Sequence, residues 1–164
     1  MKQVFLVRHA KSSWDHPGLR DIERPLNERG QQDAPFMAKL VKGKGIKPDA
    51  ILTSPAVRAL TTANYFKLEL GVDGEDFFIR DEIYESIPQT ILHLINTLPE
   101  TYQTVMIFGH NPTFTSVANL FTKDFIGNVP TCGIVGIAST ALRWPDFSAQ
   151  NAVVSDYFSP KQYS

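Results

Sequence analysis

Three short aliphatic runs, each followed at once by polar residues, constrain the fold of this chain more than any other feature. They lie at residues 4–7, 49–53 and 104–108. Runs of this length and composition are typical of strands that are buried on both faces, as in a parallel sheet. Such a sheet needs helices over both faces, so we expect strands and helices to alternate along the chain.

The segments between these runs have helical periodicity. Apolar side chains recur at spacings of three and four, which is the pattern of a helix with one buried face. Asn27 suits the N-cap of the first helix, and Pro112 suits the first turn of the last. The predicted helices span residues 28–42, 56–68, 89–98 and 112–121.

The C-terminal part of the chain favours strands with short connections, which we expect to form an antiparallel edge. These strands are predicted at residues 133–138, 141–144 and 152–158, and a further short strand near 77–79. Parallel strands joined through helices cross over with a right hand. The predicted fold class is therefore α/β, a three-layer α/β/α sandwich with a mostly parallel central sheet and an antiparallel edge.

Size and composition suit one domain over residues 1–164, because 43% of the 164 residues are apolar and 20% are charged. The net charge of −1 and the dispersed basic residues favour neither nucleic acid nor a membrane as a partner. No apolar run reaches the length of a signal-peptide core or a membrane span. Cys132 is the only cysteine, so we expect a cytoplasmic protein with this thiol in its core.

Polar side chains follow each of the three central runs. Arg8 and His9 follow the first, Arg58 comes shortly after the second, and His110 and Asn111 follow the third. The carboxyl ends of parallel strands meet at one edge of the sheet, where open α/β sheets bind their ligands. We therefore expect these side chains to converge on one site.

Two arginines and two histidines at one point carry a positive charge that a dianion or neighbouring carboxylates must offset. A phosphoryl group fits, because guanidinium groups bind its oxygens through paired hydrogen bonds. One histidine is expected to be neutral, with one ring nitrogen held by a backbone carbonyl and the other free to attack phosphorus. His9 is assigned this role because it extends directly from a central strand. His110, protonated, is expected to stabilise the phosphoryl oxygens together with Arg8 and Arg58.

Four segments, in order along the chain, resemble the motifs of the histidine phosphatase superfamily. They are residues 6–10, 26–30, 53–59 and 109–112, and the details at 8–14 and 130–133 are similar to SixA-type phosphohistidine phosphatases. The resemblance spans most of the chain and weakens after Ala138.

The resemblance implies a covalent phosphohistidine intermediate on His9, in a phosphate pocket completed by Arg8, Arg58 and His110. Ser12 and Asn111 are the candidate substrate-binding residues, with local turn or cap formation as the alternative for both. Asp15 stands where the superfamily often has an asparagine that donates to the phosphate. Because a carboxylate repels a dianion, Asp15 is not expected to touch it.

Three carboxylates are candidates for the general acid that protonates the leaving group. They are Asp81, Glu82 and Glu85, in a segment where the superfamily's phosphomutases and sugar phosphatases place a glutamate. Glu82 is favoured, and the lack of any acid is the remaining option. Imidazole, with an ordinary pKa of about 6.5, leaves far more easily than an alkoxide, so a site without an acid favours phosphohistidine as substrate.

These residues predict a phosphatase that acts on phosphohistidine carried by a signalling or phosphotransfer protein. The segment between Arg58 and His110 is nearly used up by two helices and a strand, which leaves no room for a helical lid over the site. One alternative is a phosphatase of small phosphoesters with Glu82 as acid. Another is a noncatalytic module that binds phosphorylated partners, although such a module needs no nucleophile.

Several charged or aromatic residues have a structural interpretation instead. Solvent-exposed charge is preferred for Arg20, Arg24 and Arg29, with a contact from one of them to the substrate as the alternative. Trp14 either packs its loop or stacks on a substrate. The four histidines show no paired metal-ligand spacing and no nearby cysteine or carboxylate pattern, so neither a metal nor another cofactor is expected.

Overall fold

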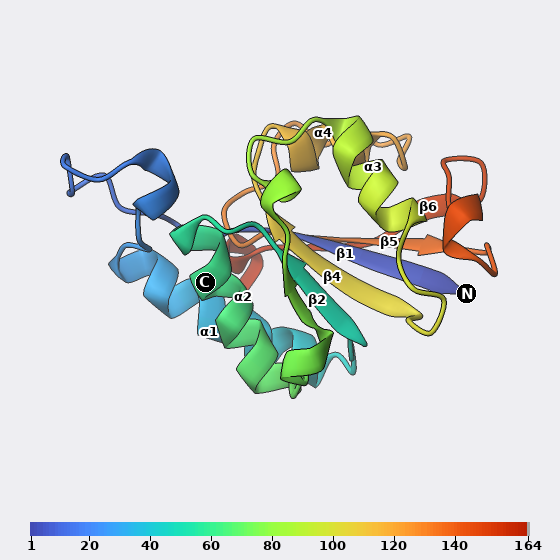
Figure 1. Ribbon diagram of the computed structural model, residues 1–164, viewed down its shortest axis with the longest axis horizontal. Helices are drawn as coiled ribbons and strands as arrows, with labels where there is room; N and C mark the ends of the chain where they lie inside the picture. The colour runs from blue at the N-terminus through green and yellow to red at the C-terminus, as the bar shows by residue number, and fades with distance from the viewer. Residues whose placement is uncertain (164) are drawn as a thin grey trace.

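The computed structural model describes residues 1–163, and within that range its centre is a mixed sheet of six strands (Figure 1). The strands are β1 (Lys2–Arg8), β2 (Ala50–Thr53), β3 (Phe77–Ile79), β4 (Thr104–Gly109), β5 (Ile134–Ser139) and β6 (Ala152–Phe158). Their order is β3-β2-β4-β1-β5-β6. The first four of these are parallel, whereas β5 runs antiparallel to both of its neighbours. The predicted parallel sheet with an antiparallel edge is confirmed.

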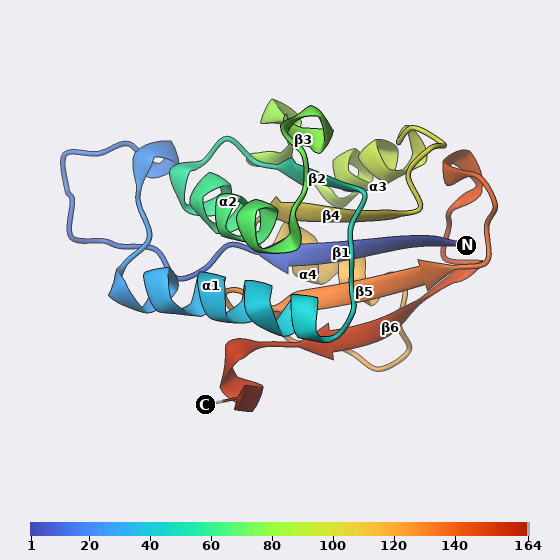
Figure 2. The same cartoon turned by 90° about the horizontal axis from the view of Figure 1, so that it is seen from below.

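Helices cover both faces of the sheet. They are α1 (Glu28–Gly43), α2 (Val57–Leu70), α3 (Pro88–Asn96) and α4 (Thr113–Asn119). Figure 2 shows α1 and α2 over one face, and Figure 1 shows α3 and α4 over the other. No helix among residues 1–163 combines the length and the apolar character needed to cross a bilayer.

Alternation of side chains along β1 divides the core between the two faces. Phe5 and Val7 pack in a cluster with α1 and α2, whereas Val4 and Leu6 pack in a cluster with α3 and α4. All four side chains are at most 1% exposed. A strand with apolar residues at every position must be buried on both faces, because successive side chains point to opposite sides. The three-layer sandwich follows from this pattern.

The helix boundaries agree with the sequence to within about two residues. The side chain of Asn27 accepts a hydrogen bond from the amide of Gly30, so Asn27 caps α1 as expected. Gly71 ends α2 in the left-handed conformation, with φ of 67°, which glycine adopts without strain.

The prediction of a strand at residues 141–144 is wrong. The chain turns there and enters a short 3₁₀ helix, Trp144–Asp146, with Pro145 in its first turn. The indole of Trp144 is fully buried and donates to the carbonyl oxygen of Tyr102 at 2.9 Å. The Trp144 amide is held by the carboxylate of Glu100 instead of by a neighbouring strand. Apolar residues at 141 and 144 therefore mark an anchored turn, not a strand.

Pairing of the parallel strands places the segments that follow them side by side. Beyond the end of β1, the amide of His9 donates to the carbonyl oxygen of Gly109 at 3.0 Å. Beyond the end of β2, the amide of Ser54 donates to the carbonyl oxygen of Phe108, also at 3.0 Å. The residues that follow β1, β2 and β4 thus share one edge of the sheet.

Gly109 provides a test of how tightly this edge is packed. A methyl group at this position would lie 2.6 Å from the ring of Phe114 and 2.9 Å from the side chain of Ile83. Gly109→Ala is therefore expected to lower the free energy of unfolding by about 1–3 kcal/mol through overpacking. Urea unfolding measures this, with Gly74→Ala as the control because nothing lies within 4 Å of that position. Equal stability of the two variants would contradict the packing described here.

Candidate active site

The structure brings Arg8, His9, Arg58 and His110 to one pocket of about 210 Å³. Arg8 and His9 lie at the end of β1, Arg58 in the first turn of α2, and His110 directly after β4. The ring centroids of His9 and His110 are 5.3 Å apart. The other residues that line the pocket are Lys11, Ser12, Trp14, Arg24, Asn111 and Thr131. The pocket is therefore strongly cationic and lies at the carboxyl edge of the sheet.

His9 is held as a neutral imidazole with a defined tautomer. Its Nδ1 lies 2.7 Å from the carbonyl oxygen of Ala10, and because a carbonyl only accepts, Nδ1 carries the proton. Burial, reinforced by the charges of His110, Arg58 and Arg8, lowers the pKa of His9 to about 3. At neutral pH the lone pair on Nε2 is therefore available for attack, as the sequence predicted for one histidine of the pair.

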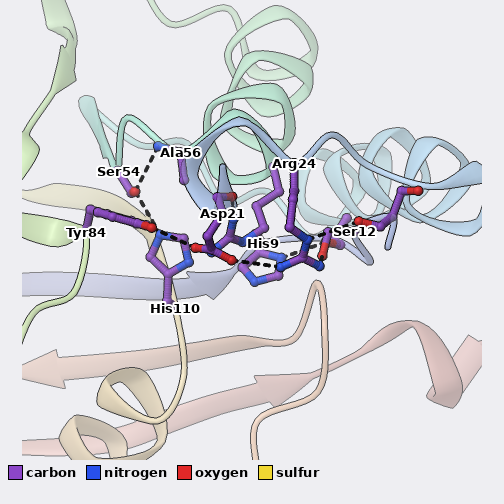
Figure 3. A network of polar contacts seen from close by, with 11 residues as sticks. His9, Ser12, Asp21, Arg24, Ser54, Ala56, Tyr84 and His110 are labelled. Carbon is purple, nitrogen blue, oxygen red and sulfur yellow. Dashed lines mark hydrogen bonds and ion pairs between the residues drawn. The ribbon is translucent and has the colours of Figure 1, made fainter. Parts of the chain in front are cut away.

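His110 is also neutral in the protein alone, contrary to the prediction that it is protonated. Burial, followed by the charge of Arg58, lowers its pKa to about 4. Its Nε2 lies 2.8 Å from Oγ of Ser54, which accepts a hydrogen bond from the amide of Ala56 (Figure 3). We assign the hydroxyl proton of Ser54 to the bond with Nε2, which leaves the ring proton on Nδ1.

Two buried donors of the pocket lack a hydrogen-bond partner among residues 1–163. They are Nε of Arg8 and Nδ1 of His110. Nη1 of Arg8 donates to the carbonyl oxygen of Val129 at 2.9 Å, which fixes the guanidinium in place. Leaving a buried donor unpaired costs about 1–3 kcal/mol, so both atoms favour an acceptor in the pocket.

Arg24 is buried and belongs to the pocket, so its interpretation as exposed charge is wrong. It is 9% exposed, its Nη2 donates to Oγ of Ser12, and its Nε donates to the carbonyl oxygen of Ser13 at 3.0 Å. Its guanidinium carbon lies 3.3 Å from the ring centroid of Trp14, which thus contacts its own loop while it also lines the pocket with most of its surface exposed. Arg20 and Arg29 are exposed, as expected.

The sequence also missed Asp21, which links the two arginines on one side of the pocket. Its carboxylate accepts from Nη1 of Arg24 at 3.0 Å and from Nη2 of Arg58 at 2.9 Å. Its backbone carbonyl accepts from Nη1 of Arg58 at 2.7 Å. Asp21 begins a short 3₁₀ turn, Asp21–Glu23, in a segment whose sequence has no hydrophobic periodicity. The only signal in the sequence is an aspartate three residues before an arginine.

The two candidate substrate-binding residues take up different positions in the pocket wall. Ser12 offers a hydroxyl that already accepts from Arg24. Asn111 uses its side chain within the fold: Oδ1 accepts from Thr115, and Nδ2 donates to Asn128 and Val129. Asn111 therefore has the local capping role that was the alternative, while it also lines the pocket.

Glu82, the favoured acid, is not among the residues that line the pocket. It is exposed and accepts two hydrogen bonds from Arg80, at 2.9 and 3.1 Å, and these bonds lower the pKa of its carboxyl group. Asp81 and Glu85 are also exposed and likewise do not line it. From this segment only Tyr84 reaches the site, where its hydroxyl donates to Asp21 at 2.7 Å and its ring meets His110 edge-on.

Cys132 is buried in the core, as expected, and its backbone supports the pocket floor. Its amide donates to the carbonyl oxygens of both Arg8 and His9 at 3.0 Å. Burial raises the pKa of its thiol, so the thiol is not a nucleophile at neutral pH. No group of three or more histidine, cysteine or acidic side chains that could hold a metal ion occurs among the residues the structure describes.

The fold and the site define an α/β protein with a cationic pocket built around a neutral histidine. The family model described as histidine phosphatase superfamily (branch 1) matches residues 4–87. An uncharacterized chloroplastic protein of Arabidopsis thaliana is 30% identical over 159 residues, covering 88% of this chain and 70% of that protein. The chain belongs to the histidine phosphatase superfamily.

Two solved structures extend the likeness over the whole fold. That of a proposed phosphohistidine phosphatase SixA from Agrobacterium tumefaciens is 31% identical with a TM-score of 0.81, covering 97% of this chain and 98% of that one. That of the protein histidine phosphatase SixA complexed with tungstate is 21% identical with a TM-score of 0.83, covering 99% of each chain. The overall architecture is that of the histidine phosphatase fold.

The lowered pKa values of His9 and His110 make stability depend on pH. Unfolded histidines have a pKa of about 6.5, so between pH 6.5 and 4 the unfolded chain binds more protons than the folded one. As the pH falls through this range, the free energy of unfolding is therefore expected to decrease, by about 2 kcal/mol for each histidine between pH 7 and pH 5.

Urea unfolding at pH 7 and pH 5 measures this loss. His110→Asn removes one of the two groups and is expected to halve the dependence, whereas His16→Asn alters an exposed side chain and serves as control. A His110→Asn variant with the full wild-type loss between the two pH values would contradict the assignment.

Proposed function

We propose that this protein is a phosphatase that forms a covalent phosphoryl intermediate on Nε2 of His9 and then hydrolyses it. The observation that carries the proposal is the Nδ1–Ala10 hydrogen bond, which leaves the Nε2 lone pair in a pocket lined by three arginines. The unpaired donors on Arg8 and His110 support it, because a phosphoryl group has acceptor oxygens for both.

The first step is attack by Nε2 of His9 on phosphorus. The P–Nε2 bond forms while the bond to the leaving group breaks, and its electron pair stays on the leaving group. Arg8, Arg58 and the Nδ1–H of His110 stabilise the charge on the phosphoryl oxygens. His9 becomes a phosphorylated imidazolium, whose Nδ1–H keeps its bond to Ala10.

The second step is attack by water on the phosphorylated His9. The P–O bond forms, the P–Nε2 bond breaks, and the electron pair returns to Nε2. One proton of the water stays on the attacking oxygen and the other passes to a phosphoryl oxygen, so the released product is dihydrogen phosphate, which then exchanges a proton with the solvent. A dianion bound in the pocket raises the pKa of His110, which favours its protonated form during turnover.

Phosphohistidine on a signalling or phosphotransfer protein is the substrate that we propose. None of the three carboxylates proposed as the general acid lines the pocket, and imidazole leaves without the strong acid that an alkoxide needs. Between α2 and α3 the chain forms only β3 and short 3₁₀ turns, so no helical segment there covers the pocket. An uncovered pocket suits a phosphoryl group carried on the surface of a protein.

The two alternatives receive less support from the geometry. A phosphatase of small phosphoesters needs Glu82 near the leaving group, whereas Glu82 pairs with Arg80 outside the pocket wall. A noncatalytic module binds phosphate through its arginines and has no use for the tautomer imposed on His9. We further propose a single-domain, cytoplasmic enzyme that uses neither metal nor cofactor, because the arginines supply the charge that a metal would provide.

Substrate preference tests the leaving-group argument. With no acid to protonate an alkoxide, kcat/KM for a phosphohistidine peptide is expected to exceed that for a phosphoserine peptide by about 10²-fold or more. Phosphate release is measured for both peptides, of matched sequence and at equal concentration. A preference for phosphoserine would favour the small-phosphoester alternative.

Covalent labelling tests the nucleophile. With ³²P-labelled substrate and a denaturing quench at alkaline pH, the wild-type protein is expected to carry label on His9. His9→Ala is expected to lose label and more than about 10³-fold in activity, yet still bind vanadate. His93→Ala, at an exposed position of α3, is the matched control. Turnover without label on the wild type would sink the covalent mechanism.

A further inference from the structure

Among residues 1–163, Asp21 is the one carboxylate that forms ion pairs with two arginines of the pocket wall. Its side chain is 51% exposed, although Arg24 and Arg58, which hold it, are almost fully buried. Figure 3 shows it between Tyr84 and Arg24. The carboxylate therefore lies at the surface, whereas His9, 8% exposed, is one of the buried residues that line the pocket.

This placement sets the position of Asp21 relative to a bound phosphoryl group. In-line attack by Nε2 of His9 directs the leaving group away from the floor and toward the opening. Asp21 lines a hollow that shares Trp14 and Arg24 with the pocket, so its half-exposed carboxylate lies next to the pocket and within reach of a group that leaves it. Oδ2 accepts from both Arg58 and Tyr84, but Oδ1 accepts only from Arg24. Because a carboxylate oxygen can accept two hydrogen bonds, Oδ1 can accept one from a substrate.

The charges around Asp21 keep it ionised. Hydrogen bonds from Tyr84, Arg58 and Arg24 hold the pKa of its carboxyl group far below the usual range, and the charge of Asp21 in turn offsets part of the lowering of the pKa of His110. His16 lies across a neighbouring hollow that Asp21 also lines. At neutral pH Asp21 is thus a hydrogen-bond acceptor only, which excludes it as a general acid.

We propose that Asp21 selects substrates whose leaving group carries an N–H, by accepting a hydrogen bond from the protonated imidazole of phosphohistidine. This inference rests on the function proposed above and names the residue that distinguishes the leaving groups. When the P–N bond breaks, its electron pair returns to the ring nitrogen, and the ring leaves as neutral imidazole with its other N–H intact. No proton has to be transferred in this step.

The same carboxylate does not assist the leaving group of an ester. An alkoxide or aryloxide has no N–H to donate, and its developing negative charge is repelled by Asp21. A nearby negative charge also favours the protonated form of a bound phosphoimidazole ring, which is the form that leaves easily. Asp21 thus favours cleavage of the P–N bond in two ways and disfavours cleavage of the P–O bond.

The test compares Asp21→Asn with wild type on phosphoimidazole and on p-nitrophenyl phosphate, whose leaving group is stable as an anion. For phosphoimidazole, kcat/KM is expected to fall by about 10- to 100-fold, as expected for the loss of a charge-assisted hydrogen bond. For p-nitrophenyl phosphate the loss is expected to be smaller by at least about tenfold. Asp21→Ala is the second variant, and Glu23→Gln, in the same 3₁₀ turn Asp21–Glu23 but paired with Arg20, is the matched control.

The pH profile of kcat separates selectivity from support of the arginines. Loss of the carboxylate is expected to move the basic limb for phosphoimidazole to lower pH, because the bound ring loses its proton more readily. Equal losses on both substrates with an unmoved limb would show that Asp21 only positions Arg24 and Arg58, and would overturn the inference. A wild-type protein that turns over p-nitrophenyl phosphate but not phosphoimidazole would instead overturn the proposed function.

Discussion

The parallel pairing of β4 with β1 on one side and β2 on the other is the constraint on which the rest of the structure depends. It brings the segments that follow the three strands to one edge and joins them through backbone hydrogen bonds from His9 and Ser54. The amide of Cys132, just before β5, then bonds to the carbonyl oxygens at the end of β1. The pocket floor is therefore part of the sheet and inherits its rigidity, which is what a nucleophile aligned on a single atom requires.

Electrostatic balance at this edge follows from burial. Four cationic side chains line the pocket, and the two imidazoles avoid adding to that charge by remaining neutral. Desolvation is the largest cause of both lowered pKa values, ahead of repulsion by the arginines. The carboxylate of Asp21 offsets the charges of two of the arginines, Arg24 and Arg58. The arginines thus give the pocket the positive charge that attracts an oxyanion, while the uncharged imidazole of His9 keeps the lone pair that a nucleophile needs.

Particular residues show why patterns along the sequence predicted some features of the structure and not others. Apolar runs and helical spacing depend only on neighbours in the chain, so the strands, the helices and the strand-end residues Arg8, His9 and His110 could be predicted. Arg24 could not, because its burial results from Trp14 and Ser12 folding back over it from the other end of a long loop. The strand predicted at residues 141–144 is a turn, because the apolar side chains there pack against distant groups rather than across a strand pair.

The sequence by itself determined the order of strands and helices, the sheet edge that carries the site and the two arginines and two histidines that meet there. The order of elements follows from hydrophobic periodicity, which is local, and the shared edge follows from a general rule of parallel sheets, that the carboxyl ends of their strands lie together. Only the tertiary structure decided the charge state of His110, the isolation of Glu82 from the pocket and the roles of Arg24 and Asp21. Those depend on desolvation and on contacts between segments far apart in the chain, which no pattern along the sequence encodes.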